Sequence, residues 1–292
     1  MLELHCHTTF SDGTLTPTEL VAEAVQRGVR VLAITDHDTC AGWEEAIAAA
    51  ESYRPDYDLT IVPGIELSTM HQGRSLHVLG FYPDLEILAK PLAERTASRW
   101  RRAETMVKRL AELGCPIEMP ELPSGAVPGR PHMARAMVKA GYIESVNEGF
   151  QKWLAEGKPA YVPYEPFSAE DGVRMLRGCG AVPVWAHAFL FKGGRIGTVL
   201  KSLVKAGLMG LEIYHPHHSP SDRRQLEEWC DEYGLLMTGG SDYHGPNNTH
   251  RSSDRQHLNK FDLPTDWLAP LQQAAATLKT QNASGKTTVL AS

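Results

Sequence analysis

Short apolar runs alternate with amphipathic stretches along most of the chain. Residues 29–35 form a nearly continuous apolar run, which is typical of a parallel strand covered on both faces. The segment before it places Thr16, Pro17 and Glu19 at the N-cap, first and third positions of a helix. Further strands are expected at 59–66, 74–82, 181–187, 208–214 and 235–244, and helices at 42–53, 168–176, 194–206, 220–233 and 264–278. This alternation predicts an α/β fold.

The alternation breaks after Pro83 and resumes near residue 166. The intervening segment is charged and helical at first, and proline and glycine then crowd residues 115–131. We interpret 84–165 as a largely helical insertion that contributes to substrate recognition, and 1–83 with 166–280 as one discontinuous catalytic domain. Residues 281–292 are rich in small polar residues, and we expect a loose tail there.

Composition and charge exclude several classes of protein. The formal net charge of −6 argues against a surface that coats DNA, because such a surface must be basic. No apolar run is long enough to cross a membrane, and no leader pattern opens the chain. The cysteines are single and odd in number, which indicates a reducing compartment. We therefore expect a cytoplasmic protein that acts without a membrane, and no obligate protein partner is indicated.

The first residues of the chain contain a candidate metal site. On a strand, the two-residue period places His5 and His7 on the same face, and Asp12 follows a few residues beyond the strand end. Neutral histidines and an ionised carboxylate suit Zn²⁺, Mn²⁺ or Fe²⁺. A lone His-x-His is a weak motif, and an ordinary strand with two packed histidines explains it equally well.

Further candidate ligands lie at or just past the ends of other predicted strands. These are His37, Glu66, His187, Asp242 and His244, while His77 lies within a predicted strand. In a parallel barrel the carboxyl ends of the strands share one rim, so these side chains would meet there. Each has an ordinary explanation as a capping carboxylate or a packed histidine. Their recurrence at one end of successive strands favours a site for several metal ions.

This set of residues resembles the PHP family, the polymerase and histidinol phosphatase superfamily of metal-dependent phosphoesterases. The matching pieces, in the family's order, are His5-x-His7, Ser11-Asp12-Gly13, Thr35-Asp36-His37-Asp38, Gly64-Ile65-Glu66, His77, His187 and Gly240-Ser241-Asp242-Tyr243-His244. The resemblance implies a distorted (β/α)₇ PHP barrel with the helical insertion. It also implies two or three divalent metal ions as cofactors, with Mn²⁺ favoured and Zn²⁺ or Fe²⁺ as alternatives.

The resemblance also implies a role for each residue. The first ion would be held by His5, His7, Glu66 and Asp242, the second by Asp12, His37 and His244, and the third by His77, His187 and a bridging Glu66. Asp36 and Asp38 would orient His37 or its neighbours. A water held between cations becomes an effective nucleophile near neutral pH, so no side-chain nucleophile is required.

Substrate choice is expected to depend on the insertion. Pro131 can open a helix near whose N-terminus Arg130 and His132 lie, a setting that suits phosphate, although a solvated helix start explains it equally well. The Arg-Pro-His segment resembles the subfamily of nucleoside 3′,5′-bisphosphate phosphatases and the exoribonuclease RNase AM, which favours a phosphate clamp.

Two other segments carry candidate substrate residues. His217 or His218 could bind phosphate or protonate the leaving oxygen, with His218-Ser219 the better match to the subfamily. The loop after His187 departs from the His-Pro-Gly of many relatives, and its Lys192 and Arg195 could meet phosphate or simply be solvated.

The sequence thus predicts a metal-dependent phosphohydrolase that acts on nucleotides. The favoured substrate is a nucleoside 3′,5′-bisphosphate that loses its 3′-phosphate, with 5′–3′ trimming of short RNA ends as a related activity. Histidinol phosphate or another small phosphomonoester is the alternative substrate. A binding or accessory module with a degenerate PHP site is the alternative of another class.

Overall fold

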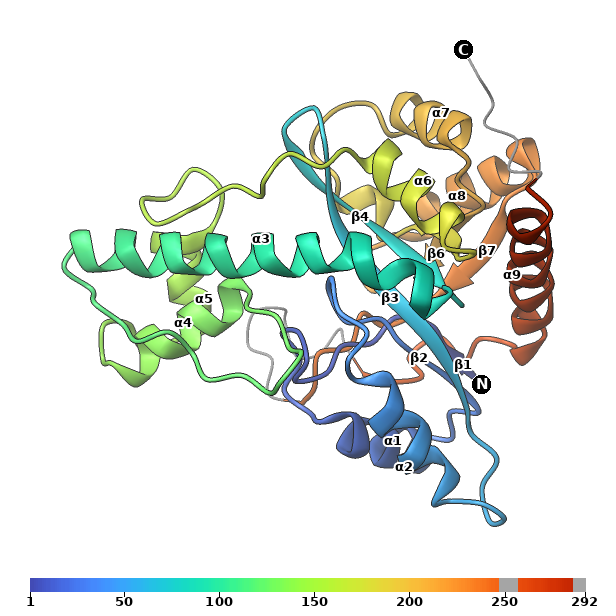
Figure 1. The fold of residues 1–292 in the computed structure, drawn as a ribbon, viewed down its shortest axis with the longest axis horizontal. Coiled ribbons are helices and arrows are strands. Elements are labelled where there is room, and N and C mark those ends of the chain that lie inside the picture. The colour runs from blue at the N-terminus through green and yellow to red at the C-terminus, as the bar shows by residue number, and fades with distance from the viewer. Residues whose placement is uncertain (247–256, 286–292) are drawn as a thin grey trace.

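A single mixed sheet of seven strands forms the centre of the molecule, and the strands follow one another in sequence order. The computed structural model describes residues 1–246 and 257–285, and Figure 1 shows the arrangement of its elements. The strands are β1 (Leu2–Glu3), β2 (Val31–Ile34), β3 (Thr60–His71), β4 (Arg74–Phe81), β5 (Val182–Trp185), β6 (Gly210–Tyr214) and β7 (Leu236–Gly239).

The strand directions explain why the barrel is distorted. β1, β2 and β3 are parallel, as are β5, β6 and β7, but β4 runs antiparallel to both of its neighbours. β3 and β4 form a hairpin whose turn uses Gln72 and Gly73, both at positive φ. Glu66 was predicted to end its strand, but β3 continues to His71 because it pairs with β4 as far as Arg74.

Backbone hydrogen bonds bring the first and last strands together. The amide of Leu4 donates to the carbonyl of Gly239 over 3.2 Å, and the amide of His7 donates to the carbonyl of Tyr243 over 2.8 Å. These bonds nearly close the sheet into a barrel, which confirms the predicted fold class. They also place His5 and His7 beside the segment that carries Asp242.

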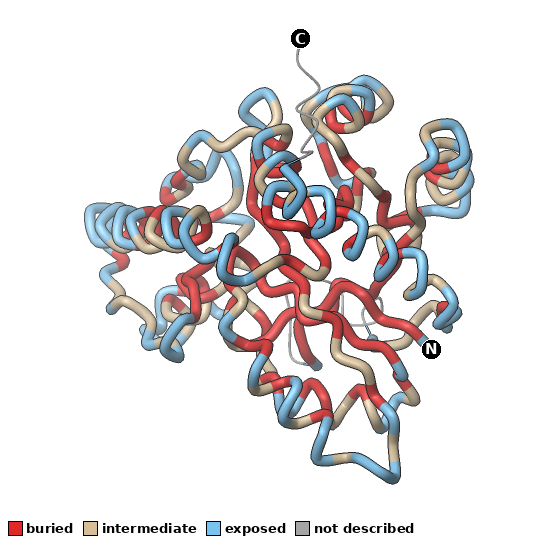
Figure 2. Tube along the Cα trace, turned by 45° about the vertical axis from the view of Figure 1, so that its right-hand side comes forward, coloured by how far each residue is buried: buried red, intermediate tan, exposed pale blue. Residues whose placement is uncertain are grey.

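Amphipathic helices cover the outside of the barrel, and Figure 2 shows the buried chain concentrated in the strands beneath them. The helices are α1 (Pro17–Gln26), α2 (Trp43–Glu51), α6 (Ala169–Gly178), α7 (Ile196–Ala206), α8 (Pro220–Tyr233) and α9 (Leu268–Ala283), with short 3₁₀ turns at Ala188–Leu190 and Thr265–Trp267. α1 begins with the capping box that its sequence predicts, formed by Thr16 and Glu19.

The segment between β4 and α6 contains helices and no strand. These are α3 (Leu85–Glu112), α4 (Arg130–Lys139), α5 (Val146–Gly149) and a π-helical turn at Phe150–Leu154. Figure 1 shows α3 extending away from the barrel, with α4 and α5 on one side of it. These helices share a separate apolar cluster that includes Met106, Leu110, Met133 and Met137. This arrangement is in line with the predicted insertion, whose boundaries stay a prediction.

The last described helix is longer than its sequence predicts. α9 ends at Ala283, five residues beyond the predicted Leu278, because Nδ2 of the Asn282 side chain donates to the carbonyl of Arg177 over 2.9 Å. The expected loose tail therefore begins with helical residues, and 286–292 lie outside the described residues. Within residues 1–246 and 257–285, no helix has the length and apolar character needed to cross a membrane.

The closure of the barrel can be tested at Gly240. A Cβ atom at this position would lie 2.5 Å from the backbone nitrogen of His5 and 2.7 Å from Oε1 of Glu3, so the strand ends would have to separate. We expect Gly240→Ala to lower the free energy of unfolding by about 1–3 kcal/mol, measured by urea denaturation. Gly178→Ala is the matched control, since a Cβ there meets nothing within 4 Å. Equal stability of the two variants would contradict this account of closure.

Candidate metal centre

All the side chains predicted as metal ligands lie in one buried cluster at the barrel rim. His5, His7 and Glu66 have no exposed surface, and Asp242 and His244 are nearly as buried. His187 and Asp242 have positive φ values of 34° and 52°, a conformation that turns the chain sharply just after β5 and β7.

Glu66 is the centre of this cluster. Its Oε1 lies 2.9 Å from a nitrogen of His77 and 2.9 Å from one of His187. Its Oε2 lies 3.0–3.3 Å from a nitrogen of His37, His7 and His5. Glu66 on β3 and His77 on β4 are diagonal neighbours on one face of the hairpin, because Glu66 pairs with Leu79.

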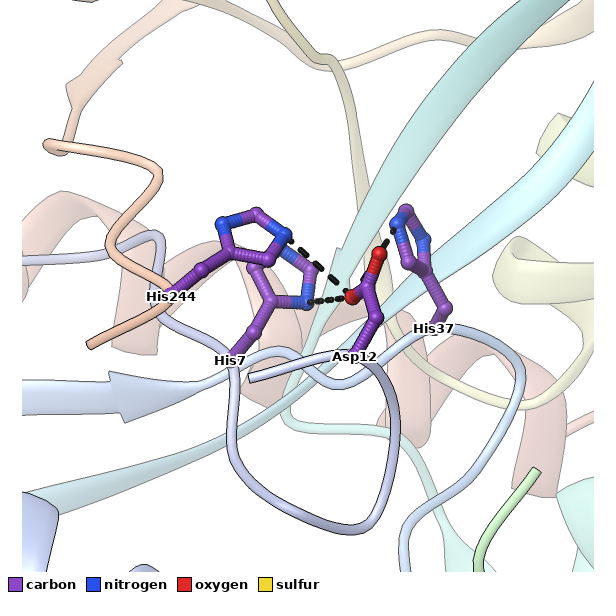
Figure 3. Close-up of side chains that lie close together, drawn as sticks. All are labelled: His7, Asp12, His37 and His244. Carbon is purple, nitrogen blue, oxygen red and sulfur yellow. Dashed lines mark ion pairs between the residues drawn. The ribbon is translucent and has the colours of Figure 1, made fainter. Parts of the chain in front are cut away.

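Asp12 is the centre of a second group. Its Oδ1 lies 3.2 Å from Nε2 of His244 and 3.9 Å from nitrogens of both His7 and His37. Figure 3 shows the carboxylate between the ring of His37 on one side and the rings of His7 and His244 on the other. The loop after β1 and the segments after β2 and β7 supply these residues.

The donor atoms form three overlapping sets, each within 4.8 Å: His7, Asp12, His37 and His244; His5, His7, Glu66 and Asp242; and His37, Glu66 and His77. Any two sets share one residue. The sets resemble the sequence-based groups, but His7 also joins the Asp12 set and His37 takes the place of His187 in the third. His187 instead contacts Glu66 directly.

The buried donor atoms of the cluster suit divalent cations. Among the described residues, five of its buried atoms have no hydrogen-bond partner: Nε2 of His5, Nε2 of His7, Oδ1 of Asp12, Nδ1 of His37 and Oε2 of Glu66. An unsatisfied buried polar group costs roughly 1–3 kcal/mol, so this arrangement needs further partners. The nitrogen and carboxylate donors are those that Mn²⁺, Fe²⁺ and Zn²⁺ accept.

The electrostatics of the cluster keep Glu66 and Asp12 ionised and His7 neutral. Burial opposes ionisation of Glu66, but the charges of His37, His77 and His5 hold the pKa of its carboxyl well below the usual range. The pKa of Asp12 is lowered in the same way, mainly by His244. Burial and the neighbouring His244 lower the pKa of His7 to about 4. Ionised carboxylates and a neutral histidine are the forms that bind metal.

Glu212 on β6 orients two of these histidines, a role that the sequence analysis missed. Its Oε1 accepts a hydrogen bond from Nδ1 of His5 over 2.8 Å, and its Oε2 accepts the backbone N–H of His187 over 2.7 Å. Although burial opposes ionisation, the charge of His5 lowers the pKa of Glu212 to about 2. The only sequence signal is a lone carboxylate within an apolar strand.

Asp36 and Asp38 also stabilise segments next to the metal-ligand candidates. Asp36 accepts hydrogen bonds from the amide and hydroxyl of Thr8 and from the hydroxyl of Ser11 over 2.5–2.7 Å. Ser11 in turn lies 3.3 Å from Nδ1 of His7, so Asp36 organises the loop that carries His7. Asp38 accepts from Nε of Arg99 over 2.6 Å, which ties the barrel to α3.

A cavity of about 280 Å³ opens beside the cluster. Its described lining is Asp12, His37, His77, His244, Arg99, Gly129, Arg130, Pro131, Phe150 and Tyr164. Its size is near the lower end of the ~300–1,000 Å³ typical of small-molecule sites. Of the substrate residues predicted from sequence, Arg130 is the one that lines this cavity. Arg99, Phe150 and Tyr164 were missed, since no local motif marks them.

The other predicted substrate residues lie elsewhere. Nδ1 of His132 accepts the amide of Gly129 over 3.0 Å, and the ring lines a neighbouring cavity of about 590 Å³. Lys192 and Arg195 are exposed and line neither cavity.

His217 and His218 follow β6 and also lie outside the lining of both cavities. His218 is buried, with Nδ1 2.9 Å from the carbonyl of Ile213 and Nε2 accepting the amide of Phe189 over 3.4 Å. It therefore braces the loop after His187. The roles predicted for these histidines stay predictions.

The orienting role of Glu212 can be tested by metal binding. Glu212→Gln would place an amide N–H against either His5 or His187, so we expect metal affinity to fall about 10–100-fold, measured by calorimetric titration. Glu170→Gln is the matched control, because Glu170 also contacts a histidine, His71, outside the cluster. Unchanged affinity in Glu212→Gln would contradict the role.

Known proteins that resemble this chain in sequence and structure include metal-dependent phosphoesterases, in agreement with the site described above. Residues 3–117 match the PHP domain family. The chain is 34% identical to the 5′-3′ exoribonuclease Rnm of Escherichia coli, covering 84% of this chain and 85% of that protein. It is 33% identical to the 3′,5′-nucleoside bisphosphate phosphatase of Chromobacterium violaceum, covering 84% and 87%.

A solved structure from Bifidobacterium adolescentis, assigned as a metal-dependent phosphoesterase, superposes with a TM-score of 0.81 at 32% identity. That match covers 94% of this chain and 96% of the other. A family match, relatives above 30% identity over most of their length and the cluster at the rim therefore agree, and the chain belongs to the PHP family of metal-dependent phosphoesterases.

Proposed function

We propose that this phosphoesterase removes the 3′-phosphate of a nucleoside 3′,5′-bisphosphate, using two or three divalent ions with Mn²⁺ favoured. His5, His7, Glu66 and Asp242 would hold one ion, Asp12, His37 and His244 a second, and Glu66, His77 and His187 a third. The overlapping donor sets support this assignment. A cytoplasmic location, predicted from the sequence, is part of the proposal.

Each part of the chain has a defined task in this reaction. Divalent cations in the cluster would activate a water and neutralise the phosphate oxygens. The histidines and carboxylates fix the positions of these charges, and Glu212 and Asp36 keep the ligands oriented. Arg99 and Arg130 bring two guanidinium groups to the cavity beside the cluster, where they would hold the substrate's phosphates.

The observation that carries the substrate proposal is the composition of the cavity. The metal ligands Asp12 and His37 share it with Arg130 and the aromatic ring of Phe150. A molecule with a phosphate to be cleaved, a further anionic group and a flat base would use all of these groups. The named activity of the Chromobacterium violaceum relative supports this choice. Histidinol phosphate has one phosphate and would leave Arg130 without a phosphate partner.

Trimming of short RNA from its 5′ end is the related activity, and the cavity of about 590 Å³ that His132 lines supports it. Arg135 and Lys139 line that cavity together with Glu118 and Glu121, and both cavities border α4. Further phosphates of a short RNA could contact these basic side chains. The name of the Escherichia coli relative supports this extension.

The activity itself gives the first test. Protein loaded with Mn²⁺ should release inorganic phosphate from adenosine 3′,5′-bisphosphate and lose this activity when a chelator removes the metal. Histidinol phosphate serves as the competing substrate. A metal-replete protein that turned over neither nucleotides nor small phosphomonoesters would contradict the proposal.

Arg130→Ala gives the second test. Loss of a charge-assisted contact to phosphate, worth about 1.5–3 kcal/mol, should lower kcat/KM for the bisphosphate about 10–100-fold. p-Nitrophenyl phosphate lacks the second phosphate and should be affected much less. Arg174→Ala, which removes an exposed arginine on α6, is the control. A similar loss on both substrates would rule out a specific clamp at Arg130.

A further inference from the structure

Hydrolysis of an alkyl phosphate leaves an alkoxide that needs a proton, and the cavity beside the cluster holds one suitable donor. Among the described residues that line it, the histidines and Asp12 belong to the proposed metal site, and Arg99 and Arg130 stay protonated. Gly129, Pro131 and Phe150 have no acidic side chain. The phenol of Tyr164 is the remaining group with an exchangeable proton.

Positive charges surround Tyr164. The guanidinium of Arg102 lies 3.9 Å from the centre of its ring, and that of Arg99 lies 5.5 Å away. Arg130 lines the same cavity from α4. These cations come from two helices of the segment between β4 and α6, and His77 faces the phenol from β4.

Arg102 is unusual because no carboxylate of the described residues forms an ion pair with it. Arg99 is paired with Asp38, but the Nε of Arg102 donates to the carbonyl of Val162 over 2.8 Å, and its buried Nη2 has no hydrogen-bond partner within the part of the chain that the structure describes. The residue is only 4% exposed. A buried guanidinium without an acid stabilises any negative charge that forms nearby.

This environment changes the acidity of the phenol. Burial favours the neutral form, but the charges of Arg99, Arg102 and Arg130 outweigh it and lower the pKa of Tyr164 to about 7. A general acid works best when its pKa is near the operating pH. An ordinary tyrosine, with a pKa near ~10, would release its proton far less readily.

We propose that Tyr164 is the general acid of the reaction, giving its hydroxyl proton to the oxygen that leaves phosphorus. This rests on the proposed phosphohydrolase activity. The bond between phosphorus and the ester oxygen breaks as a water oxygen bonds to phosphorus, and its electron pair goes to the leaving oxygen, which takes the proton of Tyr164. The attacking water loses a proton to solvent, and the phenolate regains one after the alcohol departs.

Tyr164→Phe tests this role because it removes the hydroxyl and keeps the ring beside Arg102. We expect kcat for adenosine 3′,5′-bisphosphate to fall about 10²–10⁴-fold, and kcat for p-nitrophenyl phosphate to change only a few-fold, since nitrophenolate leaves without a proton. Tyr161→Phe is the matched control, because Tyr161 does not line the cavity. An equal loss on both substrates, or none on either, would overturn the proposal.

A comparison of phenyl and p-nitrophenyl phosphate separates this role from the choice of substrate. If the wild-type protein hydrolyses aryl phosphates but no nucleotide, the nucleotide proposal fails and Tyr164 is still tested. The loss in Tyr164→Phe should be larger on phenyl phosphate than on p-nitrophenyl phosphate. Equal losses on the two would overturn the role of Tyr164.

The pH dependence of the wild-type protein needs no variant. A general acid must be protonated, so kcat on phenyl phosphate should fall as the pH rises through about 7, the pKa of Tyr164. The groups that face this phenol are Arg99, Arg102, Arg130 and His77, and a guanidinium group stays charged over this range. The fall should be absent on p-nitrophenyl phosphate. Identical profiles on the two substrates would contradict the assignment.

Discussion

The structure depends on one buried carboxylate that many histidines approach at once. The two oxygens of Glu66 lie within 3.3 Å of nitrogens from five histidines, which are spread along the chain from His5 to His187. Such a group is costly to bury unless each polar atom has a partner. Several of these atoms have none within residues 1–246 and 257–285, so the barrel rim is built for cations, and the fold and the chemistry share this constraint.

The barrel brings these donors together through its connections. Closure between β1 and β7 places His5 and His7 beside Asp242, and the antiparallel β3–β4 hairpin puts Glu66 and His77 on one face. The helical segment then supplies arginine side chains to the cavity beside the cluster. Arg99 anchors α3 to Asp38, and α4 brings Arg130 to the same cavity. Under the proposed function, the barrel would provide hydrolysis and the helical segment would surround the substrate.

The sequence predicts the parts of this arrangement that follow from local pattern. Strand periods and the common rim of a barrel placed the metal-binding candidates correctly near one another, because position at a strand end is a local property. The long β3 strand was not foreseen, since its extension beyond Glu66 depends on pairing with β4. The helical end of α9 likewise depends on a contact with Arg177, far away in the sequence.

The supporting residues could not be found in this way. Glu212 lies 207 positions from His5, and nothing in its strand indicates which histidine it contacts. The acidity of the Tyr164 phenol depends on arginines from two helices, and only folding brings these arginines together. The sequence likewise does not say where the ring of His218 points, and in the structure its Nδ1 lies 2.9 Å from the carbonyl of Ile213.

The most direct test of the central claim is anomalous scattering from crystals grown with Mn²⁺, measured on either side of the manganese absorption edge. We expect anomalous peaks within coordination distance of both Glu66 and Asp12, with His7 between them. Fully ordered crystals that showed no manganese next to Glu66 would contradict it.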